Sequence, residues 1–200
     1  MADSAFRSLT ETDAADGRPF SVCVYCGSSD ATRADYLRLA DETGAALAAR
    51  RWRMVYGGGG VGLMGRAARA ARAAGGEVLG IMPRFLARRE IVLQEVPTRM
   101  VDTMHERKRI MFDESDAFLV LPGGIGTLEE AVEMLSWRRL ELHLKPIIFL
   151  AEDDFWEPFF HLMQHTIQAR LTPPHFLDVL DSAKSVAEAL DAIDAKVVRT

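Results

Sequence analysis

The stretch LPGGIGTLEE, residues 121–130, combines a glycine turn with two adjacent carboxylates. Pro122 ends an apolar run, and the two glycines that follow permit a sharp turn of the backbone. A helix is expected to begin near Gly126 or Thr127. Its first free amides, together with the Thr127 hydroxyl, would form a cradle for a phosphate group that the helix dipole strengthens.

The two glutamates of this stretch need separate explanations, because a carboxylate would repel a neighbouring phosphate. Glu129 can act as a favourable partner of the helix dipole. Glu130 is expected on the helix face that points away from a covered sheet. The sheet-facing set is Leu128, Ala131, Val132, Leu135 and Arg139, and the opposite set is Glu130, Glu133, Met134 and Trp137. Because the opposite face mixes acids with large apolar side chains, it suggests a ligand pocket or a subunit contact.

A cation to accompany these acids occurs in DTMHERKRIMFDE, residues 102–114. Arg107 shares one helical stripe with Met104 and Met111. An arginine on a methionine stripe can snorkel along the helix surface, or it can be held at a pocket edge to meet a phosphate or a leaving base. His105 lies at a different azimuth, and a lone histidine is more often structural than catalytic.

A second glycine turn, YGGGGVGLMG at residues 56–65, resembles a dinucleotide-binding pattern. Gly57, Gly59 and Gly62 match G-x-G-x-x-G, and Glu77 follows 20 residues after Gly57. Glu77 falls at the start of its strand, however, whereas a ribose-binding acid must lie at the carboxyl end. A Walker A loop is excluded because no G-K-[ST] follows the glycines. The turn therefore indicates either close approach to a ligand or tight strand-to-helix packing.

The only two cysteines, Cys23 and Cys26, have C-x-x-C spacing. Their segment is predicted to be a strand, and residues three apart on a strand point to opposite faces. No second cysteine or cysteine–histidine pair is present to complete a metal site. We therefore expect two buried small side chains, no bound metal, and a protein of the reducing cytoplasm.

These residues are positioned by alternating strands and helices. The predicted strands are 20–26, 53–56, 77–82, 99–101, 116–121 and 146–150. The predicted helices are 31–50, 62–74, 103–114, 126–140, 155–170 and 184–195. Strand–helix alternation of this length predicts an α/β fold: a mostly parallel, Rossmann-like sheet with helices on both faces. Ligands bind such sheets at the carboxyl ends of the strands, which directs attention to residues 26–29, 56–65, 82–90 and 122–130.

The whole chain of 200 residues is consistent with one domain, residues 20–200, preceded by a flexible polar extension at residues 1–19. The extension lacks the apolar region of a signal peptide. A net charge of −5 without a basic tract argues against nucleic-acid binding. No apolar run approaches the length of about 18 residues that a membrane span requires.

Five segments together resemble the LOG (Lonely Guy) family of cytokinin riboside 5′-monophosphate phosphoribohydrolases. They are CGSS, YGGGGVGLMG, PRFLARRE, MHERKRIMFDESDAFLVLPGGIGTLEE and SWRRLELHLKPIIFL, within residues 20–181. Members have a Rossmann-like fold and form dimers or larger assemblies. They have often been labelled lysine decarboxylases, an activity that normally needs a Schiff-base lysine for pyridoxal phosphate. This chain has four lysines, none of them in a cofactor motif, so we discount that label.

The resemblance assigns roles to individual residues. It makes Arg107 and Glu130 the catalytic pair. It places nucleotide binding at Glu90, Arg107, Lys108, Gly124, Ile125, Gly126, Thr127, Leu128, Glu129 and Glu130. Ser136 keeps a hydroxyl where plant members have threonine just before the tryptophan. The segment between Glu90 and Met104 is one residue shorter than in plant members, which bears on the preference for the base.

The implied reaction is hydrolysis of the N-glycosidic bond of an N6-substituted adenosine 5′-monophosphate, without cofactor or metal. A carboxylate beside the sugar, assigned to Glu130, would stabilise positive charge on the ribose and orient the attacking water. Whether Arg107 serves the phosphate or the leaving base stays open. The expected partners are the nucleotide and further copies of the chain, with no nucleic acid and no membrane. The alternatives are a general AMP nucleosidase and a non-catalytic nucleotide or molybdenum-cofactor carrier.

Overall fold

A computed structural model describes residues 18–88 and 91–197, which form a single α/β domain. The strands are β1 (Ser21–Tyr25), β2 (Arg53–Tyr56), β3 (Val78–Pro83), β4 (Thr98–Val101), β5 (Ala117–Val120), β6 (Ile147–Leu150) and β7 (Asp181–Ala183). The α-helices are α1 (Ala34–Ala49), α2 (Gly62–Ala73), α3 (Met104–Asp113), α4 (Ile125–Arg139), α5 (Glu157–Gln168) and α6 (Val186–Lys196), and a 3-10 helix, η2, spans Pro174–Val179.

The seven strands form one parallel sheet in the order β4-β3-β2-β1-β5-β6-β7. From β1 the chain first builds outward through β2, β3 and β4, and it then returns to add β5, β6 and β7 on the other side. The strand order therefore reverses between β1 and β5. In open parallel sheets this switch point is where a crevice for ligands opens beyond the strand ends. A hydrogen bond of 3.0 Å from Gly27 N to Pro122 O joins the exits of the two strands.

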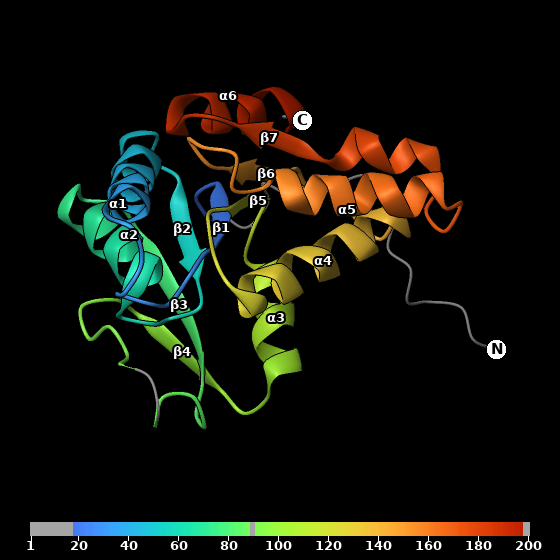
Figure 1. Ribbon diagram of the computed structural model, residues 1–200. Helices are drawn as coiled ribbons and strands as arrows, with labels where there is room; N and C mark the ends of the chain where they lie inside the picture. Colours follow the sequence, from blue (N-terminus) through green and yellow to red (C-terminus); the bar gives the residue numbers. More distant parts are fainter. Residues whose placement is uncertain (1–17, 89–90, 198–200) are drawn as a thin grey trace.

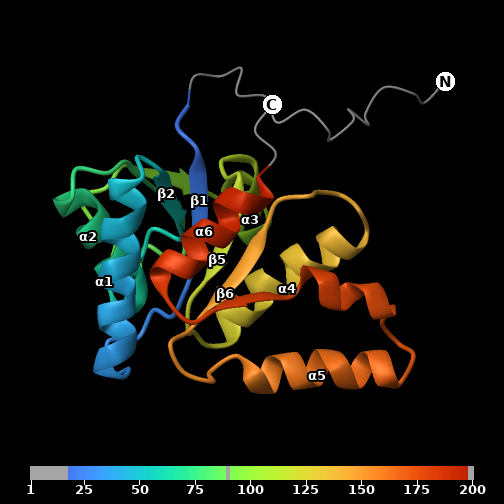
Figure 2. The ribbon, with the colours of Figure 1, turned by 90° about the horizontal axis from the view of Figure 1, so that it is seen from above.

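Helices cover both faces of the sheet (Figures 1 and 2). Residues of α1, α2 and α6 pack with one set of strand side chains, and residues of α3, α4 and α5 pack with the other set. Cys23 belongs to the second core and Cys26 to the first, so the predicted opposite orientation of the two cysteines is confirmed. Both are free and buried. The predicted α/β architecture is likewise confirmed.

All six predicted strands and six predicted helices are present, with ends shifted by a few residues. The prediction missed β7 and η2, because three residues of β7 and a proline-led turn carry almost no periodic pattern. The predicted N-terminal extension falls outside the described residues except for its end, where Arg18 forms an ion pair of 2.7 Å with Asp116. None of the described helices has the length and hydropathy that crossing a bilayer requires.

Candidate active site

A cavity of about 590 Å³ opens at the switch point. Its walls come from the segment after β1, the first turn of α2, the loop after β3, the start of α3, the turn into α4, and the loop after β6. All four strand exits selected from the sequence therefore contribute lining residues. The exit at residues 56–65 does so through Leu63 and Met64 on α2.

The N-terminus of α4 faces this cavity with open amides. Gly124 is the N-cap residue, and no side chain caps the helix. Gly124, Ile125 and Gly126 are exposed, and a Cβ added at Gly124 or Gly126 would meet nothing within 4 Å. Within the described residues, the first amides of α4 thus have no acceptor of their own. This is the arrangement expected of a phosphate cradle, with the helix beginning at Ile125.

The N-terminus of α2 is closed by contrast. Gly62 N donates to the Asp30 carboxylate at 2.7 Å, and the amides of Leu63 and Met64 both point at Gly27 O. Gly62 has φ +61°, and a Cβ there would lie 2.5 Å from the backbone of Ser28 and Ser29. The second glycine turn therefore packs two loops together and does not offer amides to a phosphate. Of the two interpretations left open by the sequence, the structure favours packing.

Gly57 has a different task in the same turn. A Cβ added at Gly57 would lie 2.0 Å from Nη2 of Arg107, so a side chain at this position would displace the guanidinium from its present place. Arg107 comes from α3, whose first turn is capped by the Thr103 hydroxyl accepting from Glu106 N at 3.0 Å. The glycine turn after β2 and the start of α3 together determine where the arginine lies.

Arg107 and Glu130 form a buried ion pair at the cavity floor. Nη1 of Arg107 lies 3.0 Å from Oε1 of Glu130, and each side chain is only 10% exposed. Nε of Arg107 donates to Ile81 O at 3.2 Å. Burial raises the pKa of Glu130 to about 6, although the arginine opposes this shift. The carboxylate is therefore largely ionised at neutral pH and poised to accept a proton.

The predicted orientation of α4 is right for Ala131 and Leu135, which are buried, but wrong for Val132. Its buried residues are Thr127, Glu130, Ala131, Met134 and Leu135. Val132, which was expected to face the sheet, is 46% exposed. Glu130 points inward because Arg107 supplies the counter-charge that an acid needs in the interior. Sequence periodicity could not reveal this partner, which comes from another helix.

Not every residue implied by the family resemblance lines the cavity. Arg107, Gly124, Ile125, Gly126, Thr127, Glu129 and Glu130 do. Leu128 and Ser136 lie outside the lining, since they are about 160° and 120° around α4 from Glu130, in opposite directions. Ser136 is exposed and Leu128 packs against the core. Glu90 lies outside the described residues.

Lys108 is also outside the lining, but it contacts a residue inside it. Its ammonium donates to the carboxylates of Glu129 and Glu133, the latter at 3.1 Å. The lysine side chain is 9% exposed, whereas that of Glu129 is 51% exposed at the cavity wall. This geometry makes Lys108 a support for Glu129.

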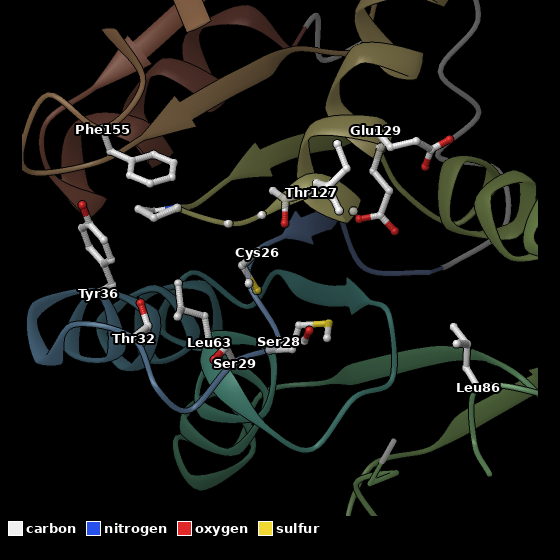
Figure 3. A pocket seen from close by; sticks show the side chains of 18 of the residues that line it. Cys26, Ser28, Ser29, Thr32, Tyr36, Leu63, Leu86, Thr127, Glu129 and Phe155 are labelled. Carbon is white, nitrogen blue, oxygen red and sulfur yellow. The ribbon is translucent and has the colours of Figure 1, made fainter. Parts of the chain in front are cut away.

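Several lining residues had no assigned role in the sequence. They are Ser28, Ser29, Thr32, Tyr36, Leu63, Met64, Leu86, Met104 and Phe155. The strand-exit rule had selected the segments of the two serines and Leu86, and the stripe with Arg107 had selected Met104. Tyr36 and Phe155 carried no signal, because they are brought to the site by packing between α1 and the loop after β6 (Figure 3).

The donor set of the site restricts its chemistry. None of the four lysines, all of which the structure describes, lines the cavity. Each has its Nζ engaged elsewhere: Lys108 as above, Lys145 with Phe112 O, Lys184 with Asp154 and Lys196 with Asp181. The cavity thus offers no amine for a Schiff base. Within residues 18–88 and 91–197, no three His, Cys, Asp or Glu side chains group as metal ligands.

Comparisons with known proteins show what the chain is similar to. The family model described as "Possible lysine decarboxylase" matches residues 64–193. A rice protein (Oryza sativa subsp. japonica) named "Probable cytokinin riboside 5′-monophosphate phosphoribohydrolase LOGL9" is 40% identical over 177 residues, covering 88% of this chain and 78% of its own. The rice cytokinin riboside 5′-monophosphate phosphoribohydrolase LOG is 39% identical, with coverage of 84% and 69%.

A solved structure shows the same fold at lower identity. The molybdenum cofactor binding protein from Rippkaea orientalis superimposes with a TM-score of 0.68 and 23% identity, over 90% of this chain and 99% of that one. Identity at this level establishes the shared architecture alone.

Proposed function

Because the chain belongs to the LOG family of cytokinin riboside 5′-monophosphate phosphoribohydrolases, we propose that it hydrolyses the N-glycosidic bond of an N6-substituted adenosine 5′-monophosphate. The products are the free base and ribose 5-phosphate. One observation carries this proposal: a single cavity holds both an uncapped helix N-terminus and a buried carboxylate–arginine pair.

The 5′-phosphate binds at the start of α4, where the amides from Ile125 to Thr127 and the helix dipole meet its negative charge. Gly124 and Gly126 add no side chain that would block this approach. The phosphate takes no part in bond cleavage, so its binding energy positions the reacting bond. It holds the ribose over the next turn of the same helix.

Glu130 acts on the sugar at that next turn. As the bond from C1′ to N9 breaks, positive charge develops on the ribose ring, and a nearby carboxylate stabilises it. The same carboxylate accepts a proton from the water whose oxygen bonds to C1′. A pKa near 6 keeps Glu130 ionised for this task at neutral pH.

Arg107 acts on the side of the leaving base. Its guanidinium lies beside Ile81 O of β3 and the turn after β2, and it pairs with Glu130 of α4. From there the Arg107 guanidinium can stabilise negative charge on the departing purine, and it favours the ionised form of Glu130. The apolar side chains of Met64, Leu86 and Met104 also line the cavity and suit a purine with an apolar N6 substituent.

Purified protein should release base and ribose 5-phosphate from isopentenyladenosine 5′-monophosphate. We expect Glu130→Gln to lower kcat by roughly 10²–10⁴-fold, because it removes a general base, while nucleotide binding changes little. Glu157→Gln, an exposed acid on α5, is the matched control and should leave kcat unchanged. Near-wild-type turnover by Glu130→Gln would contradict the assignment.

The same assay separates the rival functions. A general AMP nucleosidase would hydrolyse AMP at least as well as the prenylated nucleotide. A carrier would bind AMP in calorimetry and form no product over hours.

We also propose that the protein assembles as a homodimer or larger oligomer in the cytoplasm. Its α5 has no buried residue in the single chain, and its two buried cysteines are free, which suits a reducing compartment.

A further inference from the structure

The cavity has two ends, one on each side of the start of α4. Sheet order places the exits of β2 and β3 on one side of β1 and β5, and the exit of β6 on the other. Arg107 and Leu86 belong to the β2–β3 side, and Phe155 follows β6. Figure 3 shows the same order, with Thr127 between Phe155 on one side and Glu129 and Leu86 on the other. A nucleotide anchored at α4 with its sugar at Glu130 therefore turns the outer face of its phosphate toward the β6 end.

Two aromatic rings form the wall at the β6 end. Tyr36 from α1 and Phe155 from the loop after β6 both line the cavity. Their ring centroids are 5.6 Å apart and the rings meet edge to face at 79°. Edge-to-face contact is a favoured geometry for aromatic pairs, so the two side chains stabilise each other's position.

Asp153 holds this aromatic wall in place. The Tyr36 hydroxyl donates to Oδ2 of Asp153 at 2.7 Å, and Phe155 N donates to Oδ1 at 3.2 Å. Arg33 stacks 4.6 Å from the centre of the Tyr36 ring and also contacts Asp153 at 2.9 Å. Burial and the neighbouring carboxylate raise the pKa of Tyr36 to about 12, so the hydroxyl remains a donor. The Tyr36 side chain and the Phe155 backbone are thus tied to one carboxylate.

The charges behind the wall are unfavourable for a further anion. Asp35, Glu152, Asp153 and Asp154 all lie in this region, and each is paired with a cation there. The cations are Arg33, Arg38 and Lys184, and each of these three already has a carboxylate partner. A second phosphate placed there would meet aromatic carbon, and behind it these four carboxylates with only three cations to balance them. Like charges brought together in this way cost free energy.

Resting on the proposed function, we infer that Tyr36 and Phe155 select for a single 5′-phosphate. The wall stands next to the phosphate cradle on the side away from the sugar. A monophosphate ends at the cradle, whereas the β-phosphate of a diphosphate would extend into the rings.

Calorimetry with AMP and ADP tests this inference without requiring turnover. We expect wild-type protein to bind AMP at least about tenfold more tightly than ADP. Tyr36→Ala and Phe155→Ala should each lower this ratio about fivefold or more, mainly through tighter ADP binding. Tyr36→Phe keeps the ring and is the matched control, with a ratio close to wild type. Phe155→Leu replaces Phe155→Ala if the latter fails to fold.

The outcomes separate the inference from the proposed function. Equal affinity for AMP and ADP in the wild type, or an unchanged ratio in both alanine variants, would overturn the inference even if the enzyme cleaves its monophosphate substrate. Tight AMP binding without any product would contradict the proposed function, and the affinity ratio would still decide the role of the wall. Absence of binding to either nucleotide would overturn both.

Discussion

At the scale of single residues, the site depends on an acid that is buried together with its counter-ion. Counted over the whole residue, Glu130 and Arg107 are each 8% exposed. Either charge would be costly to bury alone. Burial shifts the pKa of Glu130 upward and the arginine limits the shift. The result is a carboxylate that is ionised at neutral pH but close to its titration point, which suits a general base.

This titration predicts the pH dependence of the enzyme. Protonation of Glu130 removes the base, so kcat/KM should fall about tenfold per pH unit below a pKa of about 6. A pH profile of the wild type checks it. Glu129→Gln should move this acid limb to lower pH, because the charge of Glu129 helps to raise the pKa of Glu130. If the residual activity of Glu130→Gln still fell below the same pH, a group other than Glu130 would be responsible for the acid limb.

At the scale of elements, two helices that both follow glycine turns have opposite roles. The N-terminus of α4 is open to the cavity, whereas Asp30 and Gly27 O occupy that of α2. The sequences GGIGT and GGVGL look alike, yet only the first offers free helix amides to a ligand. The difference arises from which loop packs against each helix start, and this depends on the order of the strands.

A pair of glycine substitutions tests this contrast. Gly62→Ala should destabilise the protein by at least about 2 kcal/mol, because φ is positive and the methyl group would collide with backbone. Gly126→Ala should stabilise it by about 0.5–1 kcal/mol, since alanine favours the helix and the site is open. Its methyl group would nevertheless raise KM by crowding the phosphate. Urea unfolding and steady-state kinetics measure both; a loss of stability in Gly126→Ala would contradict the open helix start.

At the scale of the whole molecule, the switch point of the sheet gathers residues from six separate segments into one cavity. Three helices cover each face, but α5 has no buried residue, and Leu162 on it is 54% exposed. Phe159, Phe160, Met163 and Ile167 of the same helix are only partly buried. This apolar surface on the single chain supports the proposed self-association.

Sedimentation equilibrium should therefore give a mass of at least two chains. Leu162→Asp places a charge on the α5 surface and should shift the mass toward the monomer. Ile91→Asp is the matched control, since Ile91 is 65% exposed but follows β3 at the other side of the sheet. A monomeric wild type, or an unchanged mass for Leu162→Asp alongside a reduced mass for Ile91→Asp, would contradict this assignment of the surface.

The sequence alone determined the alternation of strands and helices, the position of the strand exits and a helix start within Gly124–Thr127. These follow from local patterns: apolar periodicity, turn residues and helix starts. It also separated the two cysteines onto opposite faces.

Only the tertiary structure decided which way Glu130 points, which glycine turn is open, and that Tyr36 and Phe155 belong to the cavity. Each of these depends on a contact between segments far apart in the chain: Arg107 with Glu130, Asp30 with Gly62, and Tyr36 with Asp153. Periodicity placed Glu130 on the α4 face that points away from the sheet, and it could not tell whether a ligand pocket or a subunit contact meets that acid. The interior accepts it because another helix brings the opposite charge.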